Sequence, residues 1–185
     1  DSLPFADQVQ ACAVRLAESG VPALAGLFDL TSQRLVRYAT TLTRNQHDAE
    51  DAVQAALVQV ARHRKSFSNA RQPWPYLLRM VRNEALQIMR RKRRWALAGG
   101  LSDLLTRCLV DEVEQEESYR AVWTALRSLP STQAEVVVLK ICEEMTFAQI
   151  GQILGISTFT AGSRYRYGME KLSHKLKASG VEVTH

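Results

Sequence analysis

The sequence of 185 residues predicts an all-α protein with two helical domains joined by a linker, the C-terminal one a helix-turn-helix domain. Apolar residues recur every three or four positions through most of residues 24–94, as expected of amphipathic helices. This pattern is lost around Gly99 and Gly100 and returns near residue 119. We therefore divide the chain into an N-terminal extension of unknown role (1–23), a first domain (24–94), a linker (95–118), a second domain (119–176) and a tail (177–185).

The composition limits the classes of function. Hydrophobic residues make up 46% and charged residues 23% of the chain, which is typical of globular proteins. No apolar run approaches the ~18 residues of a membrane span, and the N-terminus does not resemble a secretory signal. The three cysteines are far apart and form no CxxC motif, so we expect a reducing cytoplasm and neither a disulfide framework nor a zinc site. Scattered histidines and the absence of a nucleophile or phosphate-loop motif predict no enzyme activity and no cofactor.

The first domain contains an amphipathic helix over residues 48–64, "DAEDAVQAALVQVARHR". One apolar stripe should face the core, and it consists of Ala49, Ala52, Val53, Ala56, Leu57, Val60 and Ala61. Asp48, Glu50 and Asp51 lie near its start, where the helix dipole favours negative charge. Ala55 and Val58 lie opposite the core stripe. The turn-rich stretch "SFSNARQP" (66–73) predicts a loop after this helix.

A second long helix is predicted from Pro73–Pro75 to residue 94, because proline is tolerated in a first turn. Trp74 and the apolar residues that follow it at helical spacing should pack into the core. The opposite side forms a polar ridge, which consists of Arg79, Asn83, Gln87, Arg90 and Arg94. It ends in five consecutive basic residues at 90–94. Their charge favours a polyanionic partner, and the aromatic rings of Phe67 and Trp95 could stack on nucleotides.

The second domain is predicted to begin with a helix that ends at Pro130. Three consecutive valines in "QAEVVVLKICEE" (133–144) favour a strand by propensity, but the flanking residues favour a buried helix. Thr146 and Gln149 form a capping box, while Gly151 and Gly155 have the spacing of a helix-turn-helix. The next helix should be capped by Ser157 and run to about residue 176. It would present Thr158, Thr160, Ser163, Arg164 and Arg166 to phosphates or base edges.

These stretches together resemble the extracytoplasmic-function (ECF) type of bacterial sigma factor of the sigma-70 family. "DAEDAVQAALVQV" is similar to the family's polymerase-binding helix, usually D-A-E-D-x-x-Q-E. "PWPYLLRMVRNEALQIMRRKRR" resembles the helix that reads the minus-ten element, usually W-L-x-x-I-A-R-N with a basic end. "LRSLPSTQAEVVVLKICEEMTFAQIGQILGISTFTAGSRYRYGMEKL" resembles the domain that reads the minus-thirty-five element, with L-P-x-x-x-x-E-V and T-V-K-S-R. The resemblance implies core RNA polymerase and promoter DNA as partners, with an anti-sigma factor as a further one.

The resemblance also implies a role for individual residues. Phe67, Ser68 and Asn69 precede the minus-ten helix and would help to hold a flipped base. Arg82 and Asn83 match the R-N pair that engages the melted strand. The residues expected to contact the minus-ten element are Phe67, Ser68, Asn69, Arg79, Arg82, Asn83, Gln87, Arg90, Arg91 and Arg94. Those expected at the minus-thirty-five element are Ser157, Thr158, Thr160, Ser163, Arg164 and Arg166. Those expected to contact core polymerase are Asp48, Asp51, Gln54, Ala55 and Val58.

Two residues depart from the family pattern and keep other functions open. Ala55 replaces the usual Glu after Gln54, which removes a polar contact to the polymerase. Gly162 replaces the usual Lys, which removes a phosphate contact and weakens the helix by about 1 kcal/mol relative to Ala. One alternative is a stand-alone helix-turn-helix transcription regulator, which needs only residues 119–176. Another is a sigma-like adaptor that keeps the fold without binding DNA.

Overall fold

A computed structural model of the chain describes residues 3–99 and 117–178. Every regular element in these two ranges is helical, which confirms the all-α prediction. The chain divides into two compact units, one within residues 1–108 (unit 1) and the other within residues 109–185 (unit 2). No helix in the described ranges is long and apolar enough to cross a membrane.

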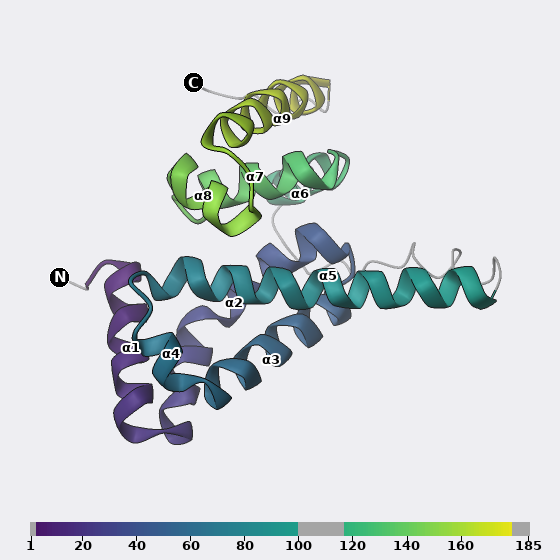
Figure 1. Ribbon diagram of the computed structural model, residues 1–185. Coiled ribbons are helices and arrows are strands. Elements are labelled where there is room, and N and C mark those ends of the chain that lie inside the picture. Colours follow the sequence, from purple (N-terminus) through teal and green to yellow (C-terminus); the bar gives the residue numbers. More distant parts are fainter. Residues whose placement is uncertain (1–2, 100–116, 179–185) are drawn as a thin grey trace. The chain divides into compact units, whose positions relative to one another are not determined.

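The described residues of unit 1 form five α-helices and one short 3₁₀ helix, whose arrangement is shown in Figure 1. Their bounds are α1 Phe5–Ser19, η1 Val21–Ala23, α2 Leu24–Thr43, α3 Gln46–Arg62, α4 Arg64–Ser68 and α5 Pro73–Gly99. A short turn joins α2 to α3, and both helices pack against α5. Asn45 caps α3, since its side-chain oxygen accepts a hydrogen bond from the backbone N–H of Asp48 at 2.9 Å. The predicted apolar stripe of α3 is buried from Ala49 to Val60, and only Ala61 at its end is half-buried.

The N-terminal residues form an integral part of unit 1. They were given no role in the sequence analysis, but α1 buries Val9, Cys12 and Leu16 and packs against α2, α4 and α5. The ring of Phe5 meets the ring of Trp74 edge-on with 4.9 Å between centroids, and the Arg34 guanidinium lies 4.0 Å from the Phe5 ring centre. These contacts tie α1 to both α2 and α5.

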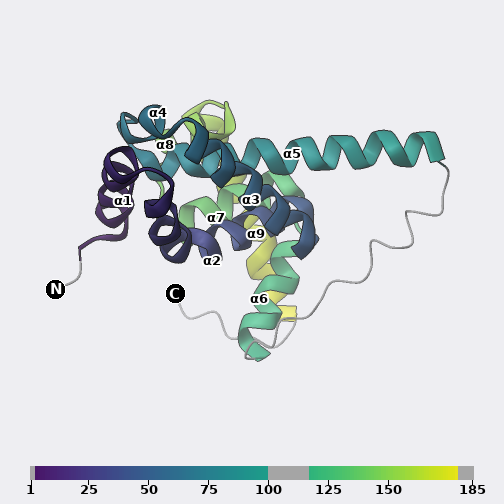
Figure 2. The same ribbon diagram turned by 90° about the horizontal axis from the view of Figure 1, so that it is seen from below.

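Helix α5 extends further than the sequence predicted. It begins at Pro73, as expected, but continues to Gly99 instead of residue 94. Both views show its C-terminal end running beyond the other helices of unit 1 (Figures 1 and 2). The apolar side is buried as predicted, with Trp74 only 3% exposed, whereas all five residues of the polar ridge are exposed.

The stretch predicted as a loop at 66–73 is partly helical, because its first residues belong to α4. Burial of Phe67 explains why this short helix forms: its ring is 1% exposed and lies 6.2 Å from the ring of Tyr76. A single helical turn has little stability of its own, so this anchoring side chain holds it in place.

Unit 2 comprises α6 Glu117–Arg127, α7 Ser131–Ile141, α8 Phe147–Leu154 and α9 Thr158–Ala178 (Figure 1). The three valines lie in α7 and are buried, which confirms the helix and not the strand that propensity favours. Burial on all sides suits branched apolar residues in either state, so here packing decides the structure. The predicted linker (95–118) falls mostly on residues 100–116, which lie outside the described residues.

The turn between α8 and α9 has the predicted capping residues. Thr146 and Gln149 form both hydrogen bonds of the capping box, and Gly155 ends α8 in the left-handed conformation at φ 68°. Gly151 has no room for a side chain. A Cβ atom at this position would lie 2.7 Å from the backbone oxygen of Ile156, so the small residue is required by the turn itself.

Candidate functional site

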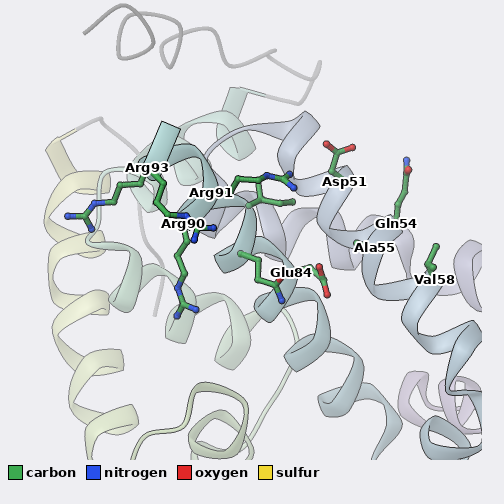
Figure 3. Close-up of a pocket in the computed structure, with 11 residues that line it drawn as sticks. Asp51, Gln54, Ala55, Val58, Glu84, Arg90, Arg91 and Arg93 are labelled. Carbon is green, nitrogen blue, oxygen red and sulfur yellow. The ribbon is translucent and has the colours of Figure 1, made fainter. Parts of the chain in front are cut away.

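A groove between α3 and α5 brings together two sets of residues predicted from separate motifs. Its volume is about 1140 Å³, and it lies entirely within unit 1. Figure 3 shows α3 residues along one wall and α5 arginines along the other. The lining residues are Asp51, Gln54, Ala55, Val58, Glu84, Gln87, Ile88, Arg90, Arg91, Arg93 and Arg94. The predicted polymerase-binding helix therefore shares a surface with part of the predicted DNA-binding helix.

The α3 wall of the groove combines polar and apolar groups. Val58 is 49% exposed, Ala55 is half-buried, and Asp51 and Gln54 are exposed. His47 Nε2 lies 3.9 Å from an Asp51 carboxylate oxygen, one helical turn earlier. Both groups of this pair are well exposed to solvent, so it contributes little to stability. This wall can therefore offer an apolar centre with polar groups beside it.

The α5 wall is dominated by positive charge. Arg90, Arg91, Arg93 and Arg94 line the groove, and Glu84 supplies one negative charge among them. All four arginine side chains are exposed to solvent. Guanidinium groups present planar arrays of donors that suit carboxylates and phosphates, so this wall favours a partner that is acidic where it meets α5.

Asp48 does not belong to the accessible wall, contrary to its predicted role in polymerase binding. Its side chain is only 9% exposed and forms an ion pair with Lys92, with Nζ 2.6 Å and 2.7 Å from its two carboxylate oxygens. The carboxylate is thus occupied within unit 1, and it also lies in the first turn of α3, where the helix dipole favours it. The same pair removes Lys92 from the basic run expected to track phosphates.

Phe67 is buried, although its predicted role requires an accessible ring. A ring that stacks on a flipped base must be accessible, whereas the Phe67 ring is 1% exposed. Its observed contribution is to pack α4 onto unit 1. The neighbouring Ser68 is half-buried and Asn69 is exposed, so the polar part of this predicted pocket stays accessible.

The structure divides the predicted minus-ten residues between two places on α5. Gln87, Arg90, Arg91 and Arg94 line the groove, whereas Arg79, Arg82 and Asn83 do not. Asn83 and Arg79 are exposed on the ridge, and Arg82 is half-buried. Trp95, which follows the groove arginines near the C-terminal end of α5, is 71% exposed. The ridge upstream of the groove is therefore a second accessible surface on the same helix.

In unit 2, the N-terminal turns of α9 carry the predicted duplex-reading residues. The Ser157 hydroxyl accepts a hydrogen bond from the Thr160 backbone N–H at 3.0 Å and lies 2.8 Å from the Thr160 hydroxyl. Ser157 is thus the predicted cap. Thr158 and Arg166 are exposed, while Ser163 and Arg164 are half-buried. The buried side of α9 consists of Ala161, Gly168, Leu172 and Leu176.

The two glycines of α9 have opposite surroundings. A Cβ atom at Gly162 would meet nothing within 4 Å, so this residue leaves open space on the accessible side. At Gly168 a Cβ atom would lie 2.9 Å from Cγ2 of Val137, because α9 packs closely on α7 there. Gly162 is apparent from the sequence as a departure from the family pattern, whereas Gly168 is not.

Other residues of the site were also missed by sequence reasoning. Glu84, Ile88 and Arg93 line the groove without having been assigned to it. The available signal was helical spacing, since residues three or four apart share a helix face. Glu84 precedes Gln87 by three residues, Ile88 precedes Arg91 by three, and Arg93 follows Arg90 by three. In the described ranges, no group of three or more His, Cys, Asp or Glu side chains is placed to hold a metal ion.

A helix-turn-helix unit and a separate unit with a cation-rich helix are typical of a DNA-binding protein. The profile of sigma-70 region 2 matches residues 27–95, and that of sigma-70 region 4 matches residues 125–174. The sigma factor CarQ of Myxococcus xanthus is 28% identical over 170 residues, which cover 91% of this chain and 98% of CarQ. The ECF sigma factor SigM of Mycobacterium tuberculosis is 30% identical over 150 residues, 81% of this chain and 75% of SigM.

Two solved structures share the fold. One is the sigma factor RpoE of Bartonella quintana in complex with the anti-sigma factor NepR, with a TM-score of 0.69 and 23% identity over 81% of this chain and 94% of that one. The other is CnrH in complex with the cytosolic domain of CnrY, with a TM-score of 0.64 and 22% identity over 93% and 99% of the two chains. The chain belongs to the ECF family of RNA polymerase sigma factors.

This membership decides between the functions left open by the sequence. A stand-alone helix-turn-helix regulator needs no sigma-70 region 2, yet residues 27–95 of this chain match that region. The chain is a promoter-recognising sigma factor whose partners are core RNA polymerase and promoter DNA.

Proposed function

We propose that the α3–α5 groove binds core polymerase, that the α5 ridge captures the opened minus-ten strand, and that α9 reads the minus-thirty-five duplex. The observation that carries this assignment is the groove itself, which joins Asp51, Gln54 and Val58 with the arginines of α5. Polymerase docking and strand capture then occur on adjacent faces of one helix. The protein acts by recognition and performs no catalysis of its own, and it works in the cytoplasm with the polymerase.

The polymerase-binding role rests on the mixed character of the α3 wall. Interfaces between proteins usually have an apolar centre and a polar rim. Val58 and Ala55 provide the centre, and Asp51 and Gln54 provide the rim. A groove between two helices suits an amphipathic helical segment of the partner. Ala55 lacks the carboxylate that the family usually has here, so this sigma factor depends more on the apolar contact at Val58.

The strand-capture role rests on the exposed ridge upstream of the groove. Asn83 can pair with a base edge through its amide, which has both a donor and an acceptor. Arg79 can bind the backbone, and Trp95 offers a stacking surface. Because the strands must separate during transcription initiation, capture of an unstacked base uses an opening that occurs anyway. Ser68 and Asn69 would contribute polar groups, whereas Phe67 would support them from the core.

The duplex-reading role rests on the N-terminal turns of α9. In helix-turn-helix proteins, the first residues of the second helix approach base edges in the major groove. Thr158, Ser163 and Arg164 would make these contacts, and Arg166 would bind phosphate. Ser157 and Thr160 would mainly fix the start of the helix, because their hydroxyls bond to each other.

We also propose an anti-sigma protein as a further partner. One of the two solved structures is a complex of a sigma factor with the anti-sigma factor NepR, and the other is a complex of CnrH with the cytosolic domain of CnrY. A protein that covers the α3–α5 groove would exclude core polymerase by direct competition. Titration of such a protein against a preformed sigma–polymerase complex would test the competition, and simultaneous binding would contradict it.

The function is tested by reconstitution. The full chain should bind core polymerase in a pull-down, and the resulting holoenzyme should start transcription from a subset of promoters in a run-off library. Failure of the chain to bind core polymerase would refute the proposal.

The division of labour is tested by two substitutions in this holoenzyme. Asn83→Ala should reduce promoter opening, measured by permanganate reactivity of unpaired thymines, with little change in duplex binding. Arg164→Ala should reduce duplex binding roughly tenfold, the typical effect of one lost base contact. Equal losses of opening and of duplex binding for Asn83→Ala would contradict the strand-capture role.

A further inference from the structure

The start of α9 carries a large apolar side chain that the proposed readout does not use. Phe159 is the second residue of α9 and is 84% exposed. Among the large hydrophobic side chains in the described ranges it is the most exposed, above Trp95 at 71%. By contrast, the Phe147 ring in the same unit packs edge-on against Tyr165 with 5.6 Å between centroids. Packing of unit 2 therefore does not account for Phe159.

Phe159 lies on the accessible side of α9. At 100° per residue it shares a face with Gly162, Ser163 and Arg166, three, four and seven positions further on. The buried side, centred on Ala161, Gly168 and Leu172, points the other way. The cap formed by Ser157 fixes the backbone immediately around Phe159, since its hydroxyl holds the N–H of Thr160. The ring is thus presented from a well-defined turn.

The surroundings of Phe159 favour DNA as its partner. The first turn of α9 contains no acidic residue, and Arg164 and Arg166 follow within two turns. Gly162, one turn after Phe159, leaves the adjacent space open, because even a Cβ atom there would meet nothing within 4 Å. A duplex can therefore approach α9 closely beside the ring. The residues at this end of the second helix are those that meet base edges in the major groove.

The major groove presents a single apolar group that a phenyl ring can recognise. This group is the 5-methyl of thymine, and phenylalanine is among the side chains that contact it. We propose that Phe159 is a specificity-determining residue of duplex readout, which selects promoters with a thymine whose methyl group contacts its ring. The inference rests on the proposed role of α9. It adds an apolar contact to a helix that has lost the usual lysine at position 162.

The experiment uses holoenzyme assembled from core polymerase and the full chain. Wild-type holoenzyme selects duplexes from a randomised pool, and the bound sequences are compared with those selected by the Phe159→Ala variant. We expect wild type to enrich thymine at one position of the upstream element, and Phe159→Ala to lose that preference while the other positions keep theirs. Affinity of the variant for the selected duplex should fall roughly tenfold, as for one mismatched base pair.

A second measurement isolates the methyl group. Deoxyuridine in place of the selected thymine removes the methyl and leaves the hydrogen-bonding pattern unchanged. Wild type should bind the substituted duplex roughly fourfold more weakly, the effect of one lost methyl contact, whereas Phe159→Ala should bind both duplexes equally. Phe159→Leu should retain part of the preference. Ile141→Ala, an exposed apolar position of unit 2 outside α9, serves as the matched control and should bind as wild type.

Three results would overturn the inference. The first is an unchanged enrichment of thymine by Phe159→Ala. The second is that deoxyuridine weakens duplex binding by wild type and by Phe159→Ala equally, which would assign the methyl contact to another residue. Loss of core polymerase binding by Phe159→Ala without DNA would assign the ring to a protein contact. A wild-type chain that forms no holoenzyme, or a holoenzyme that selects no sequence, would instead refute the proposed function from which the inference starts.

Discussion

In unit 1 the side chains around the candidate site are held by partners distant in sequence, whereas in unit 2 they are held by neighbours one turn away. Asp48 on α3 is paired with Lys92 on α5, and Phe67 on α4 is buried in a unit to which α1 contributes. In unit 2, Ser157 caps Thr160 and Thr146 caps Gln149. The two recognition surfaces therefore differ in what maintains them. Unit 1 depends on tertiary packing, and α9 depends on its own cap and on close contact with α7.

The largest expected effect concerns Phe67. Because its ring is buried, Phe67→Ala should reduce the free energy of unfolding of unit 1 by about 3–5 kcal/mol. The measurement is native-state hydrogen exchange of amides in α1 and α5. The exposed neighbour Ser66 provides a control, and Ser66→Ala should change stability by less than about 0.5 kcal/mol. A variant at Phe67 that stays as stable as wild type but loses strand binding would restore the base-stacking role.

The two glycines of α9 test the packing of unit 2. Gly168→Ala should cost about 1–3 kcal/mol, because its Cβ atom would lie too close to Val137. Gly162→Ala should stabilise unit 2 by up to about 1 kcal/mol, since alanine favours a helix and the added atom has room. Denaturant unfolding of both variants gives the comparison. A Gly168→Ala variant as stable as wild type would show that α9 does not pack on α7 in the described way.

The Asp48–Lys92 pair tests the distant support in unit 1. Asp48→Ala should reduce stability by about 1–2 kcal/mol, less than for a fully buried pair, because Lys92 is half exposed and can be hydrated. Asp51→Ala should change stability by less than about 0.5 kcal/mol and should weaken polymerase binding instead. Thermal unfolding and a polymerase-binding assay on both variants separate these roles. An Asp48 variant of unchanged stability that binds polymerase poorly would reinstate its predicted role.

A smaller effect is expected at basic residues of α5, within and upstream of its basic run. Arg79, upstream of this run, is proposed to bind the backbone of the captured strand, so Arg79→Ala should lower the slope of log affinity against log salt concentration by about 0.7–0.9. Lys92→Ala should leave this slope unchanged, because Lys92 is held by Asp48. Binding of opened promoter DNA by the holoenzyme over a series of salt concentrations provides both slopes. Equal changes for the two variants would mean that the ion pair opens when DNA binds.

The same contrast between the two units explains what the sequence could predict. The capping box at Thr146, the turn at Gly155 and the exposed ridge through Asn83 were predicted correctly, because their signals lie within one or two helical turns. The Asp48–Lys92 pair was missed, since its partners are separated by 44 residues and only tertiary structure brings them together. Phe67 was assigned to a loop because turn-forming neighbours conceal its burial. The family resemblance identified the motifs, but it did not indicate which residues of these motifs support the fold.

The central claim is that the α3–α5 groove binds core polymerase independently of the surface that reads the duplex. Its most direct test is the affinity of the full chain for core polymerase in the absence of DNA, compared between Val58→Glu and Arg164→Ala. Circular dichroism should show both variants folded, because Val58 is exposed at 49% and Arg164 lies outside the core. We expect Val58→Glu, which places a charge at the apolar centre, to weaken binding at least about tenfold, and Arg164→Ala to bind as wild type. Unchanged affinity of a folded Val58→Glu variant would contradict the account.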